Sequence, residues 1–278
     1  MTILDGKKIA GEIKSELKSE ILELEKRGIA PGLAVILVGD NPASKVYVRS
    51  KEKTCQELGI YSKVISLPQK TSEESLLSAV EKLNRDKKIH GILVQLPLPE
   101  HIDESKIIES IDPQKDVDCF HPINVGKMFL GQSKFLPCTH SGIIEILKRS
   151  NIEITGKHAV IIGRSNIVGK PLAIMLINES ATVTVCHSKT ADLRKKCLEA
   201  DILISAVGKI GLITENMVKP NAVVIDVGIN RTADDKLAGD VDFEKVKQIA
   251  GAITPVPGGV GPMTIAMLMK NTVKSADL

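Results

Sequence analysis

The fold is decided by residues 158–171, which read HAVIIGRSNIVGKP. The apolar start predicts a buried strand, Gly163 predicts a turn, and a helix is expected to begin near Val168. This order is the setting that a dinucleotide pyrophosphate requires, because a helix N-terminus presents free backbone N–H groups. The glycine pattern is imperfect, since Ser165 stands where a second glycine is usual and Gly169 comes one residue late. A plain strand–helix turn therefore remains the alternative interpretation.

Strands and helices alternate on both sides of this stretch. Apolar runs predict further strands at 182–186, 202–207 and 223–227 after it, and at 33–38, 63–67 and 91–96 before it. Between these strands, apolar residues at helical spacing and capping signals predict helices. Such alternation predicts parallel sheets covered by helices on both faces. The irregular segment 112–137 separates the two series, so we expect an α/β protein with two domains.

Composition excludes several classes of protein. The net charge of +3 is spread along the chain, and there is no Trp, which argues against a nucleic-acid partner. No apolar run approaches the roughly 18 residues of a membrane span. The five cysteines form no CxxC pair and no metal-like spacing, so we expect no metal site and reduced thiols in a cytoplasmic protein.

The residues after the strand at 182–186 bear on cofactor choice. Enzymes that use NAD place an Asp or Glu here to hold the ribose 2′-hydroxyl, whereas this chain has His187 followed by Ser188. A carboxylate would repel a 2′-phosphate, while hydroxyl and cationic groups accept one. Arg164 adds a guanidinium that suits the same phosphate. The sequence therefore predicts NADP in preference to NAD.

A second set of polar residues is a candidate for chemistry. Tyr47 and Lys51 are four residues apart on an expected helix, so they share one face. Gln95 comes near the end of an apolar strand, where ligands of open α/β sheets bind. Asp116 and Asp118 follow in the irregular segment. The alternatives are a Tyr47 packed in the core, a solvated Lys51, a Gln95 that only ties down the next turn, and acids that form a solvated turn or a cap.

Five motifs in order make the whole chain resemble the bifunctional methylenetetrahydrofolate dehydrogenase/methenyltetrahydrofolate cyclohydrolase family. They are YVRSK at 47–51, GILVQLPLP at 91–99, DVDCFH at 116–121 with NVG at 124–126, GRSNIVGKP at 163–171 and PGGVGPMT at 257–264. The resemblance implies NADP-dependent oxidation of 5,10-methylenetetrahydrofolate to 5,10-methenyltetrahydrofolate. Hydrolysis to 10-formyltetrahydrofolate, in one-carbon metabolism, would follow.

The resemblance also implies an architecture. A tetrahydrofolate-binding catalytic domain is expected at 1–137, with 263–278 returning to pack on it, and a Rossmann-like NADP-binding domain at 138–262. Substrate would lie in a cleft between the domains of a homodimer.

Residue roles follow from the same resemblance. Lys51 would be the central catalytic residue, with Gln95 beside it, Asp118 gripping the pterin and Tyr47 stacked on the aminobenzoyl ring. A loop at Pro257 and Gly258 would close over the substrate. The expected NADP contacts are Gly163, Arg164, Ser165, Ser188 and Ile229.

One position departs from the family pattern. The family commonly has Pro-Cys-Thr-Pro before the helix that follows the connection, and here His140 replaces the last proline. Losing a fixed φ at a helix start is expected to loosen the hinge. Two other functions remain open: a dehydrogenase that has lost the hydrolase step, and a non-catalytic NADP-binding module.

Overall fold

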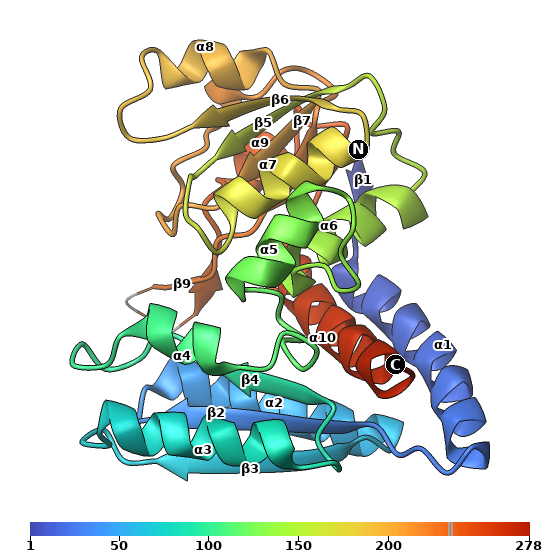
Figure 1. Ribbon diagram of the computed structural model, residues 1–278. Helices are drawn as coiled ribbons and strands as arrows, with labels where there is room; N and C mark the ends of the chain where they lie inside the picture. Colours follow the sequence, from blue (N-terminus) through green and yellow to red (C-terminus); the bar gives the residue numbers. More distant parts are fainter. Residues whose placement is uncertain (233, 235) are drawn as a thin grey trace. The chain divides into compact units, whose positions relative to one another are not determined.

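The computed structural model describes residues 1–232, 234 and 236–278 (Figure 1). It divides the chain into two compact units. Unit 1 comprises Met1–Gly11 and Thr139–Thr264, and unit 2 comprises Glu12–Cys138 and Ile265–Leu278. Both boundaries of the terminal segments fall inside helices, α1 (Gly6–Lys26) and α10 (Val260–Ala276). The expected α/β fold class is confirmed, and each unit is built on a parallel sheet.

Unit 2 contains a three-stranded sheet in the order β3-β2-β4. The strands are β2 (Gly32–Val38), β3 (Tyr61–Leu67) and β4 (Gly91–Val94). Every residue of β2 is buried, as expected of a central parallel strand covered on both faces. The helices of this unit, besides most of α1 and the end of α10, are α2 (Pro42–Leu58), α3 (Glu73–Arg85), α4 (Glu104–Ser110) and α5 (Pro122–Phe129).

Helices cover both faces of this sheet, with α3 in front of the strands and α2 behind them in Figure 1. The front face has its own apolar cluster, in which β2 residues such as Ile36 pack with Leu76 and Val80 of α3 and Ile107 of α4. The strand β4 ends one residue before Gln95, which places that amide just past the carboxyl end of the sheet.

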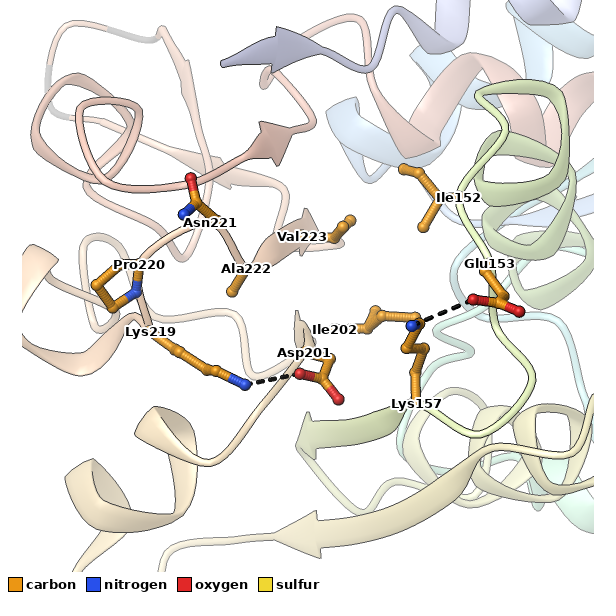
Figure 2. A pocket seen from close by; sticks show the side chains of 10 residues that line it. All are labelled: Ile152, Glu153, Lys157, Asp201, Ile202, Lys219, Pro220, Asn221, Ala222 and Val223. Carbon is orange, nitrogen blue, oxygen red and sulfur yellow. Dashed lines mark hydrogen bonds and ion pairs between the residues drawn. The ribbon is translucent and has the colours of Figure 1, made fainter.

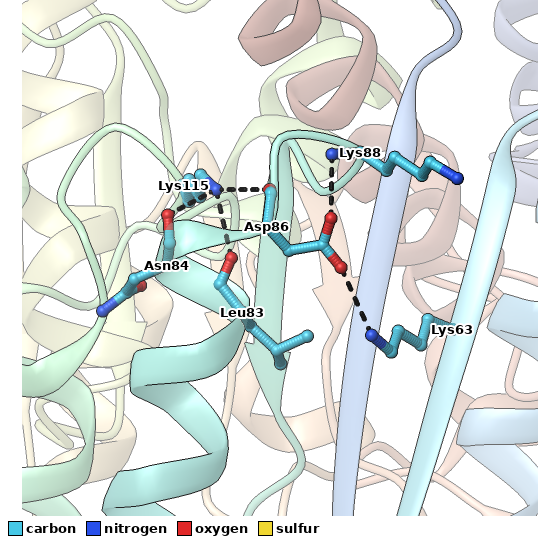
Figure 3. Close-up of polar contacts among 6 residues, drawn as sticks. All are labelled: Lys63, Leu83, Asn84, Asp86, Lys88 and Lys115. Carbon is cyan, nitrogen blue, oxygen red and sulfur yellow. Dashed lines mark hydrogen bonds and ion pairs between the residues drawn. The ribbon is translucent and has the colours of Figure 1, made fainter.

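Lys115 fastens the irregular segment to this sheet (Figure 3). Its amine donates to the carbonyls of Leu83 (3.1 Å), Asn84 (2.7 Å) and Asp86 (2.9 Å), where α3 ends. The backbone satisfies carbonyls at a helix end only in part. Leu83 accepts from the Asp86 N–H and Asp86 from the Ile89 N–H, and the Lys115 amine adds a charged donor to each. The Lys115 carbonyl in turn accepts from the backbone N–H of Ile92 in β4 (2.8 Å). The segment that carries the two aspartates is therefore held beside β4.

Unit 1 contains a six-stranded sheet in the order β1-β11-β8-β7-β5-β6, with all pairs parallel. Its strands are β1 (Thr2–Ile3), β5 (His158–Ile162), β6 (Thr182–Cys186), β7 (Ile202–Ser205), β8 (Val223–Asp226) and β11 (Ala252–Ile253). A hairpin of β9 (Asn230–Arg231) and β10 (Leu237–Ala238) follows β8. The helical elements are α6 (Cys138–Arg149), α7 (Gly169–Asn178), α8 (Leu193–Leu198), the 3₁₀ turn η1 (Glu215–Met217) and α9 (Phe243–Val246).

The first residues of the chain belong to unit 1, whereas the expected division placed them in the first domain. The reason is that β1 pairs with β11, with Thr2 opposite Ala252 and Ile3 opposite Ile253. The backbone N–H of Lys7 also donates to the Gly258 carbonyl (2.9 Å). A two-residue strand carries no periodicity, so its long-range pairing could not be predicted. The cleft expected between the domains stays a prediction.

Within the part of the chain that the structure describes, no helix has both the length and the apolar character of a membrane span.

Candidate active site

Lys51 lies in the middle of α2, whose ends match the expected signals. The side-chain oxygen of Asn41 accepts from the backbone N–H groups of Ala43 (2.9 Å) and Ser44 (3.2 Å), and Pro42 occupies the first turn. Gly59 ends the helix in the left-handed conformation, with φ of 77°. The helix buries the Lys51 side chain to 6% exposure, so the solvated-lysine alternative is wrong.

A hydrogen bond joins Lys51 to Gln95. The Lys51 Nζ donates to the Gln95 Oε1 over 2.9 Å, and the Gln95 Nε2 donates to the Leu96 carbonyl over 2.9 Å. The second bond fixes the turn after β4, which is the structural role that the alternative interpretation gave to Gln95. It also fixes the orientation of the amide, because only the oxygen is then directed at the amine. Gln95 therefore serves both as a turn anchor and as an acceptor for Lys51.

The electrostatics around Lys51 favour a neutral amine more than water does. Burial lowers the pKa of Lys51, and the negative charge of Asp118 opposes that change. Burial raises the pKa of Asp118, which the charge of Lys51 opposes and the charge of Asp116 reinforces. The thiol of Cys138 lies in the same group, and burial raises its pKa well above 9.0, so it is uncharged near neutrality. Lys51 and Asp118 thus form an interacting pair in a largely desolvated setting.

The two aspartates have different roles. Asp116 is buried and accepts from the backbone N–H groups of Phe120 (3.2 Å) and His121 (2.9 Å) and from the Asn124 side chain (2.8 Å). Asp116 is therefore the capping residue of this loop, as one alternative proposed. Asp118 keeps partial exposure and remains the carboxylate available to a ligand.

Two further residues frame this group, and sequence reasoning did not single either of them out. The Cys138 Sγ donates to the Val117 carbonyl over 3.3 Å. The Asn271 side chain, from the end of α10, donates to the same carbonyl (2.8 Å) and to that of Leu136 (2.9 Å). Both fix the residue directly before Asp118. Tyr47 is partly exposed one turn before Lys51, and burial raises its pKa.

The glycine-containing turn after β5 has the geometry of a backbone cradle. Gly163 has φ of +125°, and a Cβ built on it would lie 2.5 Å from the Ala206 carbonyl oxygen. A Cβ on Gly169, at the start of α7, would lie 2.1 Å from the Gly163 carbonyl oxygen. The Ser165 hydroxyl accepts from the backbone N–H of Val168 (3.1 Å). Both glycines are thus required by close packing. Ser165, at the position where a second glycine is usual, stabilises the turn through its hydrogen bond with Val168.

The other expected cofactor contacts lie along the same edge of the unit 1 sheet. Ser188 follows β6 by two residues and Ile229 follows β8 by three, while Gly163 directly follows β5. Arg164 and Ser188 are exposed at this edge, as is Ile229. Carboxyl ends of parallel strands meet at one edge, and that edge is where open α/β sheets bind nucleotides. The residues present fit a dinucleotide: a turn that begins with glycine, a helix N-terminus, a guanidinium and a hydroxyl.

His140 is explained by its contact with the same turn. Its side chain is fully buried, and its Nε2 donates to the Val168 carbonyl over 2.8 Å. The histidine that replaces the family proline therefore ties α6 to the residue before α7. This bond gives the segment an anchor that proline could not supply, and the expected loosening of the hinge stays a prediction.

The loop at Pro257 and Gly258 packs against the start of α1 within unit 1. Gly258 has φ of +108°, and a Cβ on Gly6 would lie 1.9 Å from the Gly259 carbonyl oxygen. Of the expected substrate contacts, these two residues belong to unit 1, whereas Tyr47, Lys51, Gln95 and Asp118 belong to unit 2.

A separate pocket of about 320 Å³ lies in unit 1 (Figure 2). It is lined by the amino ends of β7 and β8, by the residues before them, and by Ile152, Glu153 and Lys157, which precede β5. Two ion pairs border it, Lys219 with Asp201 (2.7 Å) and Lys157 with Glu153 (3.2 Å). None of the expected cofactor contacts lines this pocket, which is at the opposite end of the strands.

Comparison with known proteins identifies the family. Residues 4–118 match the family model "Tetrahydrofolate dehydrogenase/cyclohydrolase, catalytic domain". Residues 137–278 match "Tetrahydrofolate dehydrogenase/cyclohydrolase, NAD(P)-binding domain". The chain belongs to the tetrahydrofolate dehydrogenase/cyclohydrolase family. The resemblance that the sequence motifs indicated is therefore confirmed.

Relatives match this chain of the tetrahydrofolate dehydrogenase/cyclohydrolase family over nearly its full length. Bifunctional protein FolD of Moorella thermoacetica is 60% identical over 274 residues, which are 99% of this chain and 98% of that protein. The crystal structure of FolD from Campylobacter jejuni is 55% identical with a TM-score of 0.98, covering 100% of this chain and 99% of that one. The FolD of Trypanosoma brucei, solved with NADP cofactor and inhibitor, is 40% identical with a TM-score of 0.96, covering 100% and 97%.

Proposed function

We propose that this protein oxidises 5,10-methylenetetrahydrofolate to 5,10-methenyltetrahydrofolate with NADP and then hydrolyses the product to 10-formyltetrahydrofolate. Both steps belong to one-carbon metabolism. The observation that carries the proposal is the buried Lys51 amine held by Gln95 over 2.9 Å, in a chain of this family. A buried lysine with an oriented acceptor suits proton transfer, and the family supplies the substrate class.

Lys51 is the proton-transfer group of the hydrolytic step. Water adds to the methenyl carbon and gives a proton to the neutral Lys51 amine. The protonated amine then gives this proton to the ring nitrogen as the bond between that nitrogen and the carbon breaks. The added hydroxyl loses its proton to solvent as it becomes the formyl C=O, so the formyl group stays on the other nitrogen and one proton is released overall. An ordinary lysine is too basic for this exchange near neutrality, and the burial of Lys51 lowers its pKa. The cationic substrate lowers that pKa further, because like charges disfavour the ammonium.

Gln95 and Asp118 support this exchange in different ways. The Gln95 amide oxygen accepts from the amine and so fixes its direction. The Asp118 carboxylate offers two acceptor oxygens, which match the parallel N–H donors of an aminopyrimidinone ring. Tyr47 is placed one turn from Lys51 and stacks on the aminobenzoyl ring. Pro257 and Gly258 contribute the loop that closes over the substrate.

The carboxyl edge of the unit 1 sheet holds the cofactor. Gly163 and Ser165 present backbone to the pyrophosphate near the start of α7, and Ile229 contacts the cofactor from the end of β8. Arg164 and Ser188 bind the 2′-phosphate, which explains the preference for NADP. NADP, when bound, supplies the hydride acceptor of the first step. That step needs alignment more than acid or base, so the task of these residues is positioning.

We also propose that the protein is a cytoplasmic homodimer, with 1–137 and 263–278 as the folate domain and 138–262 as the cofactor domain, except that the first residues pair within the sheet of the cofactor domain. Its five buried, free cysteines are consistent with a reducing compartment. Light scattering on the purified protein tests the dimer, since a monomer mass would contradict it.

One assay separates this function from its two rivals. The protein is mixed with methylenetetrahydrofolate and NADP, and NADPH formation and methenyl decay are followed in the same cuvette. We expect NADPH to form and the methenyl product to decay faster than it does without enzyme. NADPH without accelerated decay would indicate a dehydrogenase alone, and neither signal would indicate a non-catalytic module.

A further inference from the structure

Two buried carboxylates in unit 1 belong to none of the roles described above. Asp226 ends β8 and is 4% exposed, and Asp240 follows the hairpin of β9 and β10 and is 0% exposed. A carboxylate this deeply buried is costly unless hydrogen bonds compensate it. Their donors are therefore informative about what the two residues hold in place.

Asp240 accepts from both loops that follow β7 and β8. Its Oδ2 accepts from the Val207 N–H (2.8 Å), the Gly208 N–H (3.3 Å) and the Ser205 hydroxyl (3.0 Å). Its Oδ1 accepts from the Lys209 N–H (2.8 Å) and the Asn230 side chain (3.2 Å). One carboxylate thus accepts hydrogen bonds both from the backbone of 207–209 and from the end of the loop 227–230.

Asp226 holds Asp240 in place. Its Oδ1 accepts from the Gly228 N–H (2.9 Å) and the Asp240 N–H (3.0 Å), and its Oδ2 accepts from the Val241 N–H (2.9 Å). The packing is reciprocal. A Cβ on Gly228 would lie 2.2 Å from the Asp240 Oδ1, and one on Gly239 would lie 1.9 Å from the Asp226 Oδ2. Each carboxylate therefore lies directly against a glycine of the opposite loop.

Both loops reach the expected cofactor contacts. Ile229 lies between Gly228 and Asn230, which contact Asp226 and Asp240. At the other loop, Ala206 donates its N–H to the Ile162 carbonyl (2.8 Å), and its own carbonyl limits the space at Gly163. The two aspartates thus hold both of the loops, after β7 and after β8, that form part of the carboxyl edge of the unit 1 sheet, here called the cofactor edge.

We propose that Asp240 is a positioning residue for NADP. Asp240 holds the loops after β7 and β8 in their binding conformation, and Asp226 fixes the backbone of Asp240. This inference rests on the proposed function of the cofactor edge. Asp240 acts through the backbone of 207–209 and through Asn230. It therefore affects the cofactor and not the hydrolytic chemistry, whose Lys51 and Gln95 belong to unit 2.

The test is Asp240→Asn, with NADP binding measured by titration calorimetry in the absence of folate. An amide has one acceptor oxygen and places N–H groups against backbone N–H groups, so the loops lose part of their support. We expect the Kd for NADP to rise roughly tenfold or more. The KM for NADP should rise in parallel, while the KM for the folate substrate and the cyclohydrolase rate, which needs no NADP, stay near those of the parent.

The matched control is Asp242→Asn, two residues away, whose carboxylate pairs with Lys245 at 3.2 Å. Its Kd for NADP should equal that of the parent. A folded Asp240→Asn protein with unchanged Kd would overturn the inference, as would a parallel loss of dehydrogenase and cyclohydrolase rates. A parent protein that binds no NADP would instead overturn the proposed function.

Two milder variants cover the case in which Asp240→Asn does not fold. Ser205→Ala and Asn230→Ala each remove one donor to Asp240 and leave its carboxylate and the backbone bonds in place. Each should weaken NADP binding by about two- to tenfold without changing the cyclohydrolase rate. Unchanged NADP binding in both variants would overturn the inference.

Discussion

Two substitutions of Gln95 should shift the pKa of Lys51 in opposite directions. In Gln95→Leu the Lys51 ammonium loses its acceptor at 2.9 Å. A hydrogen bond to a charged group contributes about 1.5–3 kcal/mol, and water replaces part of it because Gln95 is partly exposed. A net loss of about 1.4 kcal/mol corresponds to one pH unit. The rising limb of the cyclohydrolase pH profile should therefore move about one unit toward lower pH, since the neutral amine forms more easily.

Gln95→Glu should move the same limb the other way. Two unit charges 2.9 Å apart attract by about 6 kcal/mol at an effective dielectric constant near 20. Desolvation of the new carboxylate offsets much of this, and an opposite charge at such range changes a pKa by about 1–3 units. Lys51 would then stay protonated near neutrality. Hydrolysis should be slow there and recover as the pH rises.

The assay is the decay of methenyltetrahydrofolate, corrected for uncatalysed decay, across a range of pH for both variants. Gln56→Glu is the matched control, because it makes the same change of charge on an exposed part of α2. Its profile should match that of the parent. Shifts in the same direction for the two Gln95 variants, or no shift in either, would refute the role given to the Lys51–Gln95 bond.

Three further predictions concern the cofactor edge and stability. Replacing Arg164 and Ser188 together with alanine should raise the KM for NADP about 10–100-fold while leaving the folate KM nearly unchanged, and an enzyme that prefers NAD would contradict this. Lys115→Met should lower the free energy of unfolding in urea by about 2–3 kcal/mol, because three carbonyls lose a charged donor, whereas the exposed Lys88→Met should not. Burial raises the pKa of Asp226 from 3.8 to about 6, so its contribution to stability is present below about pH 4 and is lost as the pH rises toward 6. Urea unfolding of Asp226→Asn should lack this part of the pH dependence, and an unchanged difference between pH 4 and 7 would count against it.

Local signals predicted much of the fold. The apolar runs predicted the strands β2 to β8. The Asn41 and Gly59 caps of α2 were also predictable, because capping depends on neighbouring residues. The two-residue strands β1 and β11 were missed, and they pair with each other across about 250 residues of the chain. Contacts of that separation leave no local pattern.

The site was predictable in its residue types and less so in its contacts. Lys51 and Gln95 were both candidates, but their hydrogen bond joins residues 44 apart in the chain and depends on how β4 and α2 pack. Asp116 and Asp118 could not be told apart, because only tertiary bonds make the first a buried cap. Asp240 lies in a polar stretch that looks like a solvated loop, and only the distant loops at 205–209 and 230 reveal its burial.

Lys51→Met gives the most direct test of the division of labour between the two steps. Methionine keeps the length of the apolar part of the side chain and removes the amine that carries the proton. We expect cyclohydrolase activity to fall by about 10²–10⁴-fold, with NADP-linked oxidation still measurable in the same folded protein. Equal loss of both activities, with folding unchanged, would contradict the assignment of Lys51 to proton transfer in hydrolysis.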